Sequence, residues 1–277
     1  MRQSRRKRPR KALGQHWLAD RRLLTRIAAS ADFSDEDTVV EVGAGTGLLT
    51  GLLAERARRL IAVEVDPDLA AALRERFAGR PQVCIVEADV LAVPPEELLA
   101  RGGGRLPYVV VGNLPYFIGT AIVRHFLQAR VQPRWLLVTL QAEVAASMAA
   151  GPGRMSYLGV ETQLFADARV LFSLPPRAFR PPPKVRSAVL RLDVLDGTAV
   201  EVDEREAFLR LVRAGFAAPR KRLRNSLAVG LRSTPTEAEA ILSAAGIDPT
   251  LRPAALSLED WQQLYRAYRR AAVPAPR

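Results

Sequence analysis

The stretch Thr38-Val39-Val40-Glu41-Val42-Gly43-Ala44-Gly45-Thr46-Gly47 joins a run of apolar, mostly β-branched residues to a loop with three glycines. Residues 38–42 predict a buried strand, and residues 47–57 predict the helix that follows it. Glycines allow the connecting loop to turn sharply and to approach a ligand closely. A strand, a glycine loop and a helix in this order are typical of open α/β sheets that bind ligands at the carboxyl ends of their strands.

Strands and helices alternate along the residues that flank this loop. Asp20 can cap a helix that runs to about Ala31, and Pro67 stands at the first turn of a helix that runs to Phe77. This alternation indicates a doubly wound α/β fold, with a parallel sheet and helices on both faces. The other expected strands cover residues 60–65, 83–86, 108–112, 135–140, 170–173 and 187–194, and the other expected helices cover residues 120–129 and a segment ending at residue 149.

The pattern changes after Asp193. The polar stretch Asp193–Glu206 predicts a linker, and only helical periodicity remains from there to Tyr268. We therefore predict a flexible basic arm at residues 1–11, an α/β domain at residues 12–195 and a small helical domain at residues 196–277. Two apolar stripes mark the expected C-terminal helices, one of Leu209, Val212 and Phe216 and the other of Trp261, Leu264 and Tyr265.

Length and composition exclude several classes of protein. The 277 residues are 48% apolar, which suffices for a large core and a second small domain. The sequence shows no run of 18 apolar residues and no apolar core of a signal peptide, and its single cysteine, Cys84, cannot form an internal disulfide. We therefore expect a cytoplasmic protein. One cysteine and two histidines offer few ligands to a transition metal, so we predict no metal site.

The chain is strongly basic, with a net charge of +12 and a pI near 10.8. Three separate stretches contain basic residues and no acid: residues 1–11 hold seven, residues 177–191 hold five and residues 210–224 hold six. A single basic tail could serve solubility alone, but three such stretches favour a nucleic-acid partner. The residues that we expect to contact nucleic-acid phosphates are Lys184, Arg220, Lys221, Arg222 and Arg224.

The glycine loop has the pattern G-x-G-x-G, with Glu41 two residues before it. A dinucleotide fingerprint would need a glycine in place of Leu48, and a phosphate-binding P-loop would need a Gly-Lys-Ser/Thr ending. The loop instead resembles the S-adenosylmethionine loop of class I methyltransferases. Glu64, at the end of the next strand, is within the usual reach of ribose hydroxyls, and Asp89, after the third strand, can accept from an adenine amino group. Either acid alone could equally be a solvated carboxylate at a strand end.

The fourth strand ends in Asn113-Leu114-Pro115-Tyr116. The Asn113 side-chain oxygen and a backbone carbonyl near Pro115 can accept both N–H groups of an exocyclic amine, and Tyr116 offers a face for stacking. Two acceptors would free the lone pair of the amine nitrogen for attack on an electrophile. Next to a methyl donor, this turn indicates N-methylation of a base, with positioning rather than a strong general base as the source of catalysis. The tetrapeptide could also be an ordinary turn at a strand end.

Taken in order, these motifs resemble those of the ribosomal RNA adenine dimethyltransferases over nearly the whole chain. Residues 13–18 are similar to that family's motif over the cofactor, residues 179–189 to its F-x-P-P-P-K-V-x-S-A-V motif, and residues 218–227 to a helix start in its C-terminal domain. The resemblance implies that Phe179 packs on the target adenine opposite Tyr116. It also implies a set of cofactor contacts, which are Gln15, His16, Leu18, Gly43, Gly45, Glu64, Asp89 and Asn113.

Within the family, the complete C-terminal segment resembles the housekeeping bacterial branch. That implies dimethylation of the N6 atoms of two adjacent adenosines near the 3′ end of 16S rRNA in the small ribosomal subunit, by a monomer that uses S-adenosylmethionine. Two alternatives stay open, namely 23S rRNA adenine methylation by the antibiotic-resistance branch and a ribosome-assembly factor with weak catalysis. A small-molecule N-methyltransferase conflicts with the charge. The chain departs from the family's usual residues at His16, Trp17, Phe117, Ala142 and Arg186.

Overall fold

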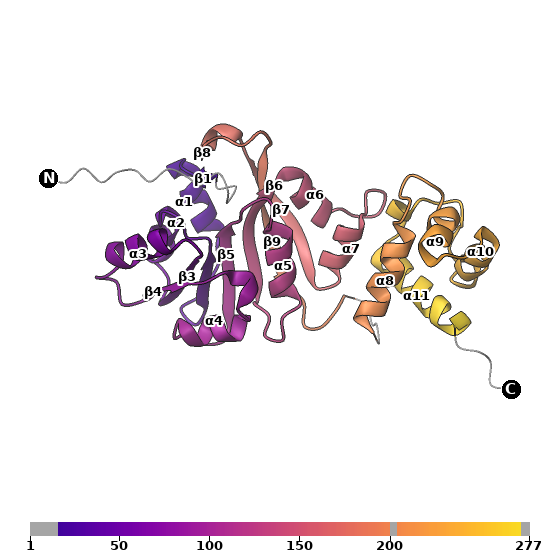
Figure 1. The fold of residues 1–277 in the computed structure, drawn as a ribbon, viewed down its shortest axis with the longest axis horizontal. Coiled ribbons are helices and arrows are strands. Elements are labelled where there is room, and N and C mark those ends of the chain that lie inside the picture. Colours follow the sequence, from indigo (N-terminus) through magenta and orange to yellow (C-terminus); the bar gives the residue numbers. More distant parts are fainter. Residues whose placement is uncertain (1–15, 200–203, 273–277) are drawn as a thin grey trace. The chain divides into compact units, whose positions relative to one another are not determined.

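The structure of this protein is a computed structural model that describes residues 16–199 and 204–272. Strands and helices alternate through the first part of the chain, and helices alone follow in the last part (Figure 1). The α/β fold with a C-terminal helical part is therefore confirmed. The expected arm at residues 1–11 and the expected cofactor contact Gln15 lie outside the described residues.

A seven-stranded sheet forms the centre of the α/β part. Its strands are β2 (Thr38–Val42), β3 (Arg59–Glu64), β4 (Val83–Glu87), β5 (Tyr108–Asn113), β6 (Trp135–Gln141), β7 (Ala166–Leu174) and β9 (Ser187–Val194). They lie in the order β4-β3-β2-β5-β6-β9-β7, with β2 to β6 parallel and β9 antiparallel to β6. The chain order reverses between β2 and β5, and open α/β sheets bind ligands beside the carboxyl ends of such a pair.

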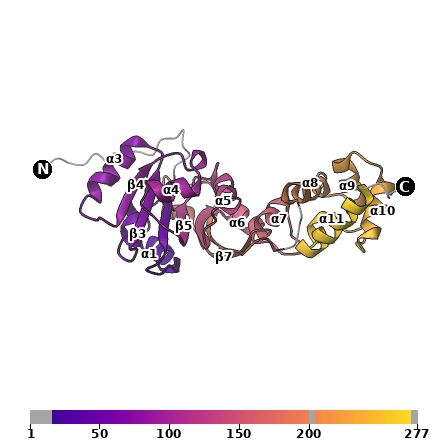
Figure 2. The ribbon, with the colours of Figure 1, turned by 90° about the horizontal axis from the view of Figure 1, so that it is seen from below.

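Helices cover both faces of this sheet (Figure 2). The helices of this part are α1 (Arg21–Ser30), α2 (Leu48–Leu53), α3 (Pro67–Arg76), α4 (Pro95–Arg101), α5 (Gly119–Leu127) and α6 (Ala142–Met148). Leu60 packs in one core with the buried residues of α1 and α2. Its neighbour Ile61 points the opposite way, toward Gly102 at the end of α4. Asp20 caps α1 as expected, because its carboxylate accepts from the amides of Arg22 and Leu23.

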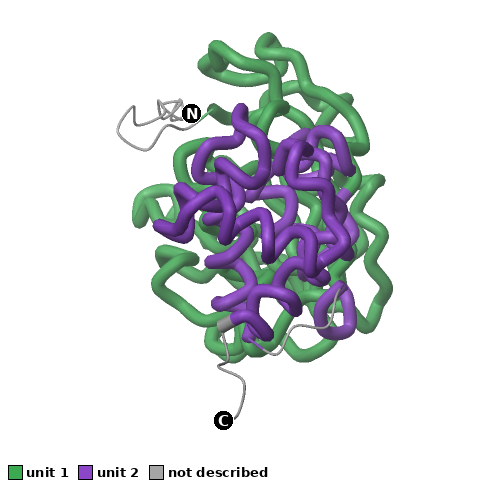
Figure 3. Tube along the Cα trace, turned by 90° about the vertical axis from the view of Figure 1, so that its right-hand side faces the viewer, with its two compact units in different colours: residues 1–145, 169–194 green, residues 146–168, 195–277 purple. Residues whose placement is uncertain are grey.

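The chain divides into two compact units (Figure 3), one of residues 1–145 and 169–194 and the other of residues 146–168 and 195–277. We expected the division near residue 195, and the structure adds residues 146–168 to the helical unit. The reason lies in contacts within that unit: the amides of Gly153 and Met155 donate to the carbonyl of Ala254, and Arg213 donates to the hydroxyl of Tyr157 at 2.9 Å. The helices here are α7 (Tyr157–Gln163), α8 (Arg205–Gly215), α9 (Leu223–Leu231), α10 (Pro235–Ala244) and α11 (Leu258–Ala272).

The core of the helical unit forms around Trp261, which is fully buried on α11. Trp261, Leu264 and Tyr265 are buried together, as the second apolar stripe predicts. In the first stripe Val212 is fully buried and Phe216 packs on Trp261, as expected. Phe208, rather than the half-buried Leu209, packs edge-on against Tyr265 with ring centroids 5.7 Å apart. None of the helices in the described part of the chain is long and apolar enough to cross a membrane.

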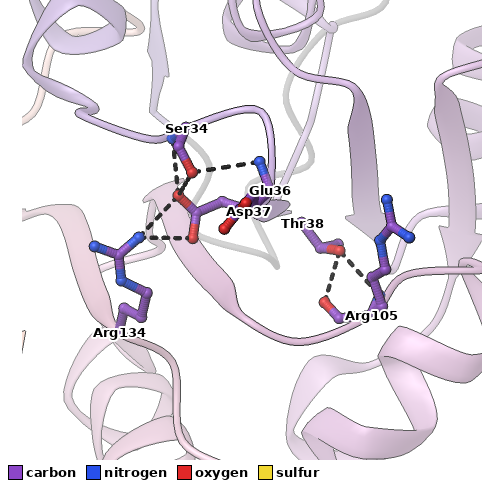
Figure 4. Close-up of polar contacts among 6 residues, drawn as sticks. All are labelled: Ser34, Glu36, Asp37, Thr38, Arg105 and Arg134. Atoms are coloured by element: carbon purple, nitrogen blue, oxygen red, sulfur yellow. Dashed lines mark hydrogen bonds and ion pairs between the residues drawn. The ribbon is translucent and has the colours of Figure 1, made fainter.

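A polar network fixes the amino-terminal end of β2 (Figure 4). The buried carboxylate of Asp37 accepts from the amide and hydroxyl of Ser34 at 2.8 and 2.9 Å and from the guanidinium of Arg134 at 3.0 and 3.1 Å. Beside it, the hydroxyl of Thr38 donates to the carbonyl of Arg105 and accepts from its amide. These bonds tie β2 to the segments that lead into β5 and β6, and so they fix the strands whose far ends form the site.

We expect Asp37→Ala to lower the free energy of unfolding by about 2–3 kcal/mol, since it leaves the Ser34 amide without its buried acceptor. Urea denaturation of the full chain would measure this loss. The matched control is Arg134→Gln, because the Arg134 side chain is 55% exposed whereas that of Asp37 is fully buried. The control should cost less than about 1 kcal/mol. Equal losses in the two variants would show that the ion pair, rather than the Ser34 bonds, carries the effect.

Candidate active site

The glycine loop leaves β2 at the switch point of the sheet. Gly43, Gly45 and Gly47 have φ values of 72°, 57° and 74°, in the left-handed region that favours glycine. The Gly43 amide donates to the carbonyl of Val63 at 2.9 Å, which holds the loop against the end of β3. A side chain at Gly47 would also meet Leu73 at 2.7 Å, so the loop closes tightly on α3.

Glu64 holds this loop from the end of β3. The carboxylate is 3% exposed and accepts from the amide of Gly45 at 2.8 Å and from the amide of Asp66 at 3.0 Å. Each carboxylate oxygen can accept more than one hydrogen bond, so Glu64 can support the loop and still accept from a ligand hydroxyl. Asp66 caps α3, as the sequence indicates, through the amides of Asp68 and Leu69.

Asp89 follows β4 and lies on the same side of the sheet. Its carboxylate accepts from the amide of Leu91 at 3.0 Å and so caps the short 3₁₀ helix of residues 90–92. The Asp89 side chain is exposed and contributes to the wall of the same cavity as Glu64. The two acids therefore line neighbouring parts of one site, as their places after successive strands predict.

Asn113 ends β5, and its side chain has a fixed orientation. The amide nitrogen, Nδ2, donates to the carbonyl of His16 at 3.1 Å, which leaves Oδ1 as the acceptor end of the group. The turn behind it is closed by two backbone bonds, from Leu114 to the carbonyl of Thr139 at 3.2 Å and from Ile118 to the carbonyl of Pro115 at 3.2 Å. Asn113 can thus present an oxygen to an amine at a defined position.

Tyr116 is half-buried at the end of this turn. Its hydroxyl forms a hydrogen bond with the hydroxyl of Ser187 on β9. Burial raises the pKa of Tyr116 above its usual value, and the bond with Ser187 opposes this rise. Since the ordinary pKa is already near 10, the phenol stays neutral at physiological pH and offers a ring face rather than a base.

A cavity of about 270 Å³ connects these groups. It lies within the α/β unit at the carboxyl ends of the central strands, where the sheet order reverses. Phe117 lines the cavity with 64% of its surface exposed, which makes it an apolar residue at the rim. The residues expected from the sequence that line the cavity are His16, Gly43, Gly45, Glu64, Asp89, Asn113, Leu114, Pro115 and Tyr116.

A short strand covers one side of the glycine loop. The strand β1 (Trp17–Leu18) pairs antiparallel with β8 (Phe179–Arg180), with Leu18 opposite Phe179. The indole of Trp17 lies over Gly45, where an added Cβ would stand 3.7 Å from the ring. Leu18 is buried in the main core and lines a second, small cavity of about 40 Å³ behind the glycine loop.

Phe179 does not lie where the resemblance places it. Its side chain is fully buried in the core that contains Leu18 and Leu174, and it does not line the cavity. The pairing of β1 with β8 explains this burial, because Phe179 is directly opposite Leu18 and joins the same core. The ring beside Tyr116 is instead that of His16, with centroids 5.5 Å apart and an interplanar angle of 28°.

Glu41 stands two residues before the glycine loop, and no role was predicted for its side chain. In the structure this side chain is 2% exposed, and its Oε2 atom has no hydrogen-bond partner among the described residues. Burial raises the pKa of Glu41 to about 8. Hydrogen bonding by Thr50 opposes this rise in pKa, and the negative charge of Glu64 adds to it. Glu41 lines the small cavity behind the loop. The sequence could have indicated this burial, because Glu41 stands within an apolar strand. All five residues of that strand are buried, and an acid there has no access to water.

The basic residues expected to contact RNA have different surroundings. Arg220, Lys221 and Arg222 are exposed at the start of α9, and Lys184 is exposed after β8. Arg224 is partly buried and forms an ion pair with Glu239 at 2.9 Å. Arg224 therefore has a structural partner within the helical unit, which the sequence did not reveal.

The order of the strands and the cavity at the switch point between β2 and β5 define a Rossmann-like fold, and the glycine loop with Glu64, Asp89 and Asn113 at this cavity gives it the site expected of a methyltransferase. The profile of the family "Ribosomal RNA adenine dimethylase" matches residues 6–270. The chain belongs to this family.

Similar proteins extend over nearly the whole chain. It is 41% identical over 259 residues to a ribosomal RNA small subunit methyltransferase A of Dehalococcoides mccartyi, covering 94% of this chain and 88% of the relative. A protein of the same name from Geobacter sulfurreducens is 42% identical over 260 residues, covering 93% and 94%. The 23S rRNA methyltransferase ErmE has a similar structure, with a TM-score of 0.71 and 33% identity over 91% of this chain and 98% of that chain. A dimethyladenosine transferase from Plasmodium falciparum shares the fold, with a TM-score of 0.78, 20% identity and coverage of 93% and 99%.

Proposed function

We propose that this protein uses S-adenosylmethionine to dimethylate the N6 atoms of two adjacent adenosines near the 3′ end of 16S rRNA, as part of small-subunit biogenesis. The observation that carries this proposal is the fixed orientation of Asn113, whose Nδ2 bonds to His16 while Oδ1 remains as an acceptor beside the glycine loop. The names of the relatives at about 40% identity supply the ribosomal subunit.

The residues present fit this cofactor. S-adenosylmethionine supplies a methyl group that a sulfonium makes electrophilic. The glycines allow a close approach of the backbone, and Gly43 and Gly45 have positive φ values that other residues rarely adopt. Glu64 would accept from the ribose hydroxyls and Asp89 from the adenine amine. The unpartnered Oε2 of Glu41 behind the loop is a buried polar atom that a ligand group could satisfy.

The chemistry on the target side is mainly positioning. The Oδ1 atom of Asn113 would accept one N–H of the adenine amine, and a carbonyl near Pro115 would accept the other. Tyr116 would stack on the base, with its neutral phenol held by Ser187. His125, on α5, bonds to the carbonyl of Val93 and serves in packing. The proton released from N6 after methyl transfer can leave to solvent, so the mechanism needs no strong base.

The test is methyl transfer from labelled S-adenosylmethionine to small and large ribosomal subunits that lack the modification, followed by nucleoside mass spectrometry of each rRNA. Dimethyladenosine in the small-subunit RNA is the expected result. The product in large-subunit RNA alone would move the chain to the resistance branch, to which the structural likeness to ErmE gives some weight. No product in either, with tight small-subunit binding, would support an assembly factor.

Three exposed cations at the start of α9 should contribute to rRNA binding. We expect the triple variant Arg220→Ala, Lys221→Ala, Arg222→Ala to reduce the salt dependence of small-subunit binding, with a log–log slope lower by about 2 to 3, because each cation releases about one counterion. Binding measured between low and moderate salt would give this slope. Arg224→Gln is the matched control, since Arg224 is already paired with Glu239 and should change the slope by less than about one unit. An unchanged slope in the triple variant would contradict the RNA role of this segment.

A further inference from the structure

The imidazole of His16 is held in place by contacts to two segments. Its ring lies on Tyr116, with centroids 5.5 Å apart at an angle of 28°, within the range of stacked aromatic pairs. Its Nδ1 atom forms a hydrogen bond of 2.8 Å with the carbonyl of Pro181, just after β8. The backbone of the same residue accepts from Nδ2 of Asn113. His16 therefore lies between the end of β5 and the segment after β8, and it contacts both.

The target base would occupy the same face of Tyr116 that His16 covers. A base whose amine reaches Oδ1 of Asn113 must lie near Tyr116, three residues further along the same turn. Phe179, which the resemblance places on the other side of the base, is buried in the core. The flat ring found on Tyr116 is that of His16, which stacks on it and hydrogen-bonds through a ring nitrogen, as an adenine could.

We propose that His16 is a placeholder for the target adenine: its imidazole covers Tyr116 in the RNA-free protein and leaves this position when the base enters. The inference rests on the proposed function, since it assumes that a base stacks on Tyr116. Base entry then costs the stack and the Pro181 bond whichever base enters, so the imidazole of His16 lowers the affinity of the site for all bases alike. The preference for adenine comes from Asn113, because the amine of adenine can bond to its acceptor oxygen and so offset this cost.

The stack itself can be tested without RNA. The chain has two histidines, His16 and His125, so the imidazole C–H signals in an NMR spectrum of histidine-labelled protein are few. The spectrum of His125→Gln lacks the His125 signals, and the comparison assigns the signals of both residues. Tyr116→Leu should shift the His16 signals downfield, because the ring current of Tyr116 is lost, and leave those of His125 in place. His16 signals that do not respond to Tyr116→Leu would overturn the proposal.

Displacement is tested by titrating adenosine monophosphate into the full chain, with saturating S-adenosylhomocysteine filling the cofactor part of the cavity. The His16 signals should move toward their position in Tyr116→Leu, and uridine monophosphate at the same concentration should move them less. Signals that stay fixed with adenosine monophosphate would overturn the displacement. A lack of methyl transfer to ribosomal subunits would instead count against the proposed function, so the two failures are distinguishable.

A pair of variants separates the ring from the rest of the residue. His16→Asn removes the aromatic ring and should bind adenosine monophosphate about fivefold more tightly, because no stack must be broken. His16→Phe keeps a ring on Tyr116 and should not gain affinity. Equal or weaker binding in His16→Asn would show that the imidazole assists the base rather than standing in for it.

Discussion

Asn113→Ala is expected to lower the single-turnover rate of methyl transfer by about 10²- to 10³-fold, the usual loss when one preorganised hydrogen-bonding group of an active site is removed. The structure gives the reason. Oδ1 is held in position because Nδ2 bonds to His16, and alanine removes both the acceptor and this tether. The measurement is a rapid-quench assay with small subunits and excess enzyme, which isolates methyl transfer from product release.

The cofactor half of the site should survive this change. Asn113→Ala leaves the glycine loop and its bond to Glu64 untouched, so binding of S-adenosylhomocysteine, measured by calorimetry, should weaken by less than about tenfold. Asn113→Asp is the matched variant, because it keeps an oxygen acceptor while it loses the Nδ2 donor. Its rate should fall between those of the native protein and Asn113→Ala. Full activity in Asn113→Ala would show that the Asn113 side chain is not needed to position the target amine.

Those parts of the site that depend on local pattern could be predicted from the sequence. The glycine loop needs left-handed backbone at fixed positions, and only the glycines supply it without strain. Glu64 and Asn113 end parallel strands and Asp89 follows one, so their order along the chain places them at one edge of the sheet. The short helix α4, at Pro95–Arg101, was not predicted.

Contacts between distant segments could not be predicted. Phe179 is buried because β8 pairs with β1, and nothing near Phe179 in the sequence indicates that Leu18 is its neighbour. The stack of His16 on Tyr116 depends on the same pairing. Arg224 looked like a free cation in an acid-free stretch, but its partner Glu239 comes from the next helix. In each case a residue type suggested a role, and a tertiary contact gave it another environment.

Glu41→Gln is expected to stabilise the cofactor-free protein at alkaline pH. Burial raises the pKa of Glu41 to about 8, whereas the unfolded chain has the ordinary value of 4.5. Below about pH 4.5, Glu41 is neutral in both the folded and the unfolded protein, and its burial does not reduce the free energy of unfolding. As the pH rises through 8, the unfolded chain is favoured because Glu41 ionises there more easily, and the free energy of unfolding falls. Since one pKa unit corresponds to about 1.4 kcal/mol, the loss could reach about 5 kcal/mol, and structural relaxation reduces it to about 2–4 kcal/mol.

Urea unfolding of both proteins between pH 5 and pH 9 isolates this group, because all other titrations are shared and cancel in the difference. The expected difference is small near pH 5 and grows to about 2–4 kcal/mol in favour of Glu41→Gln at pH 9. Glu64→Gln is the control, and its effect at pH 9 should have the opposite sign, because both Glu64 oxygens accept backbone amides and glutamine retains one acceptor. A difference between the native protein and Glu41→Gln that does not change with pH would show that Glu41 titrates normally in the folded protein. Its unpartnered oxygen would then be satisfied by water rather than kept for a ligand.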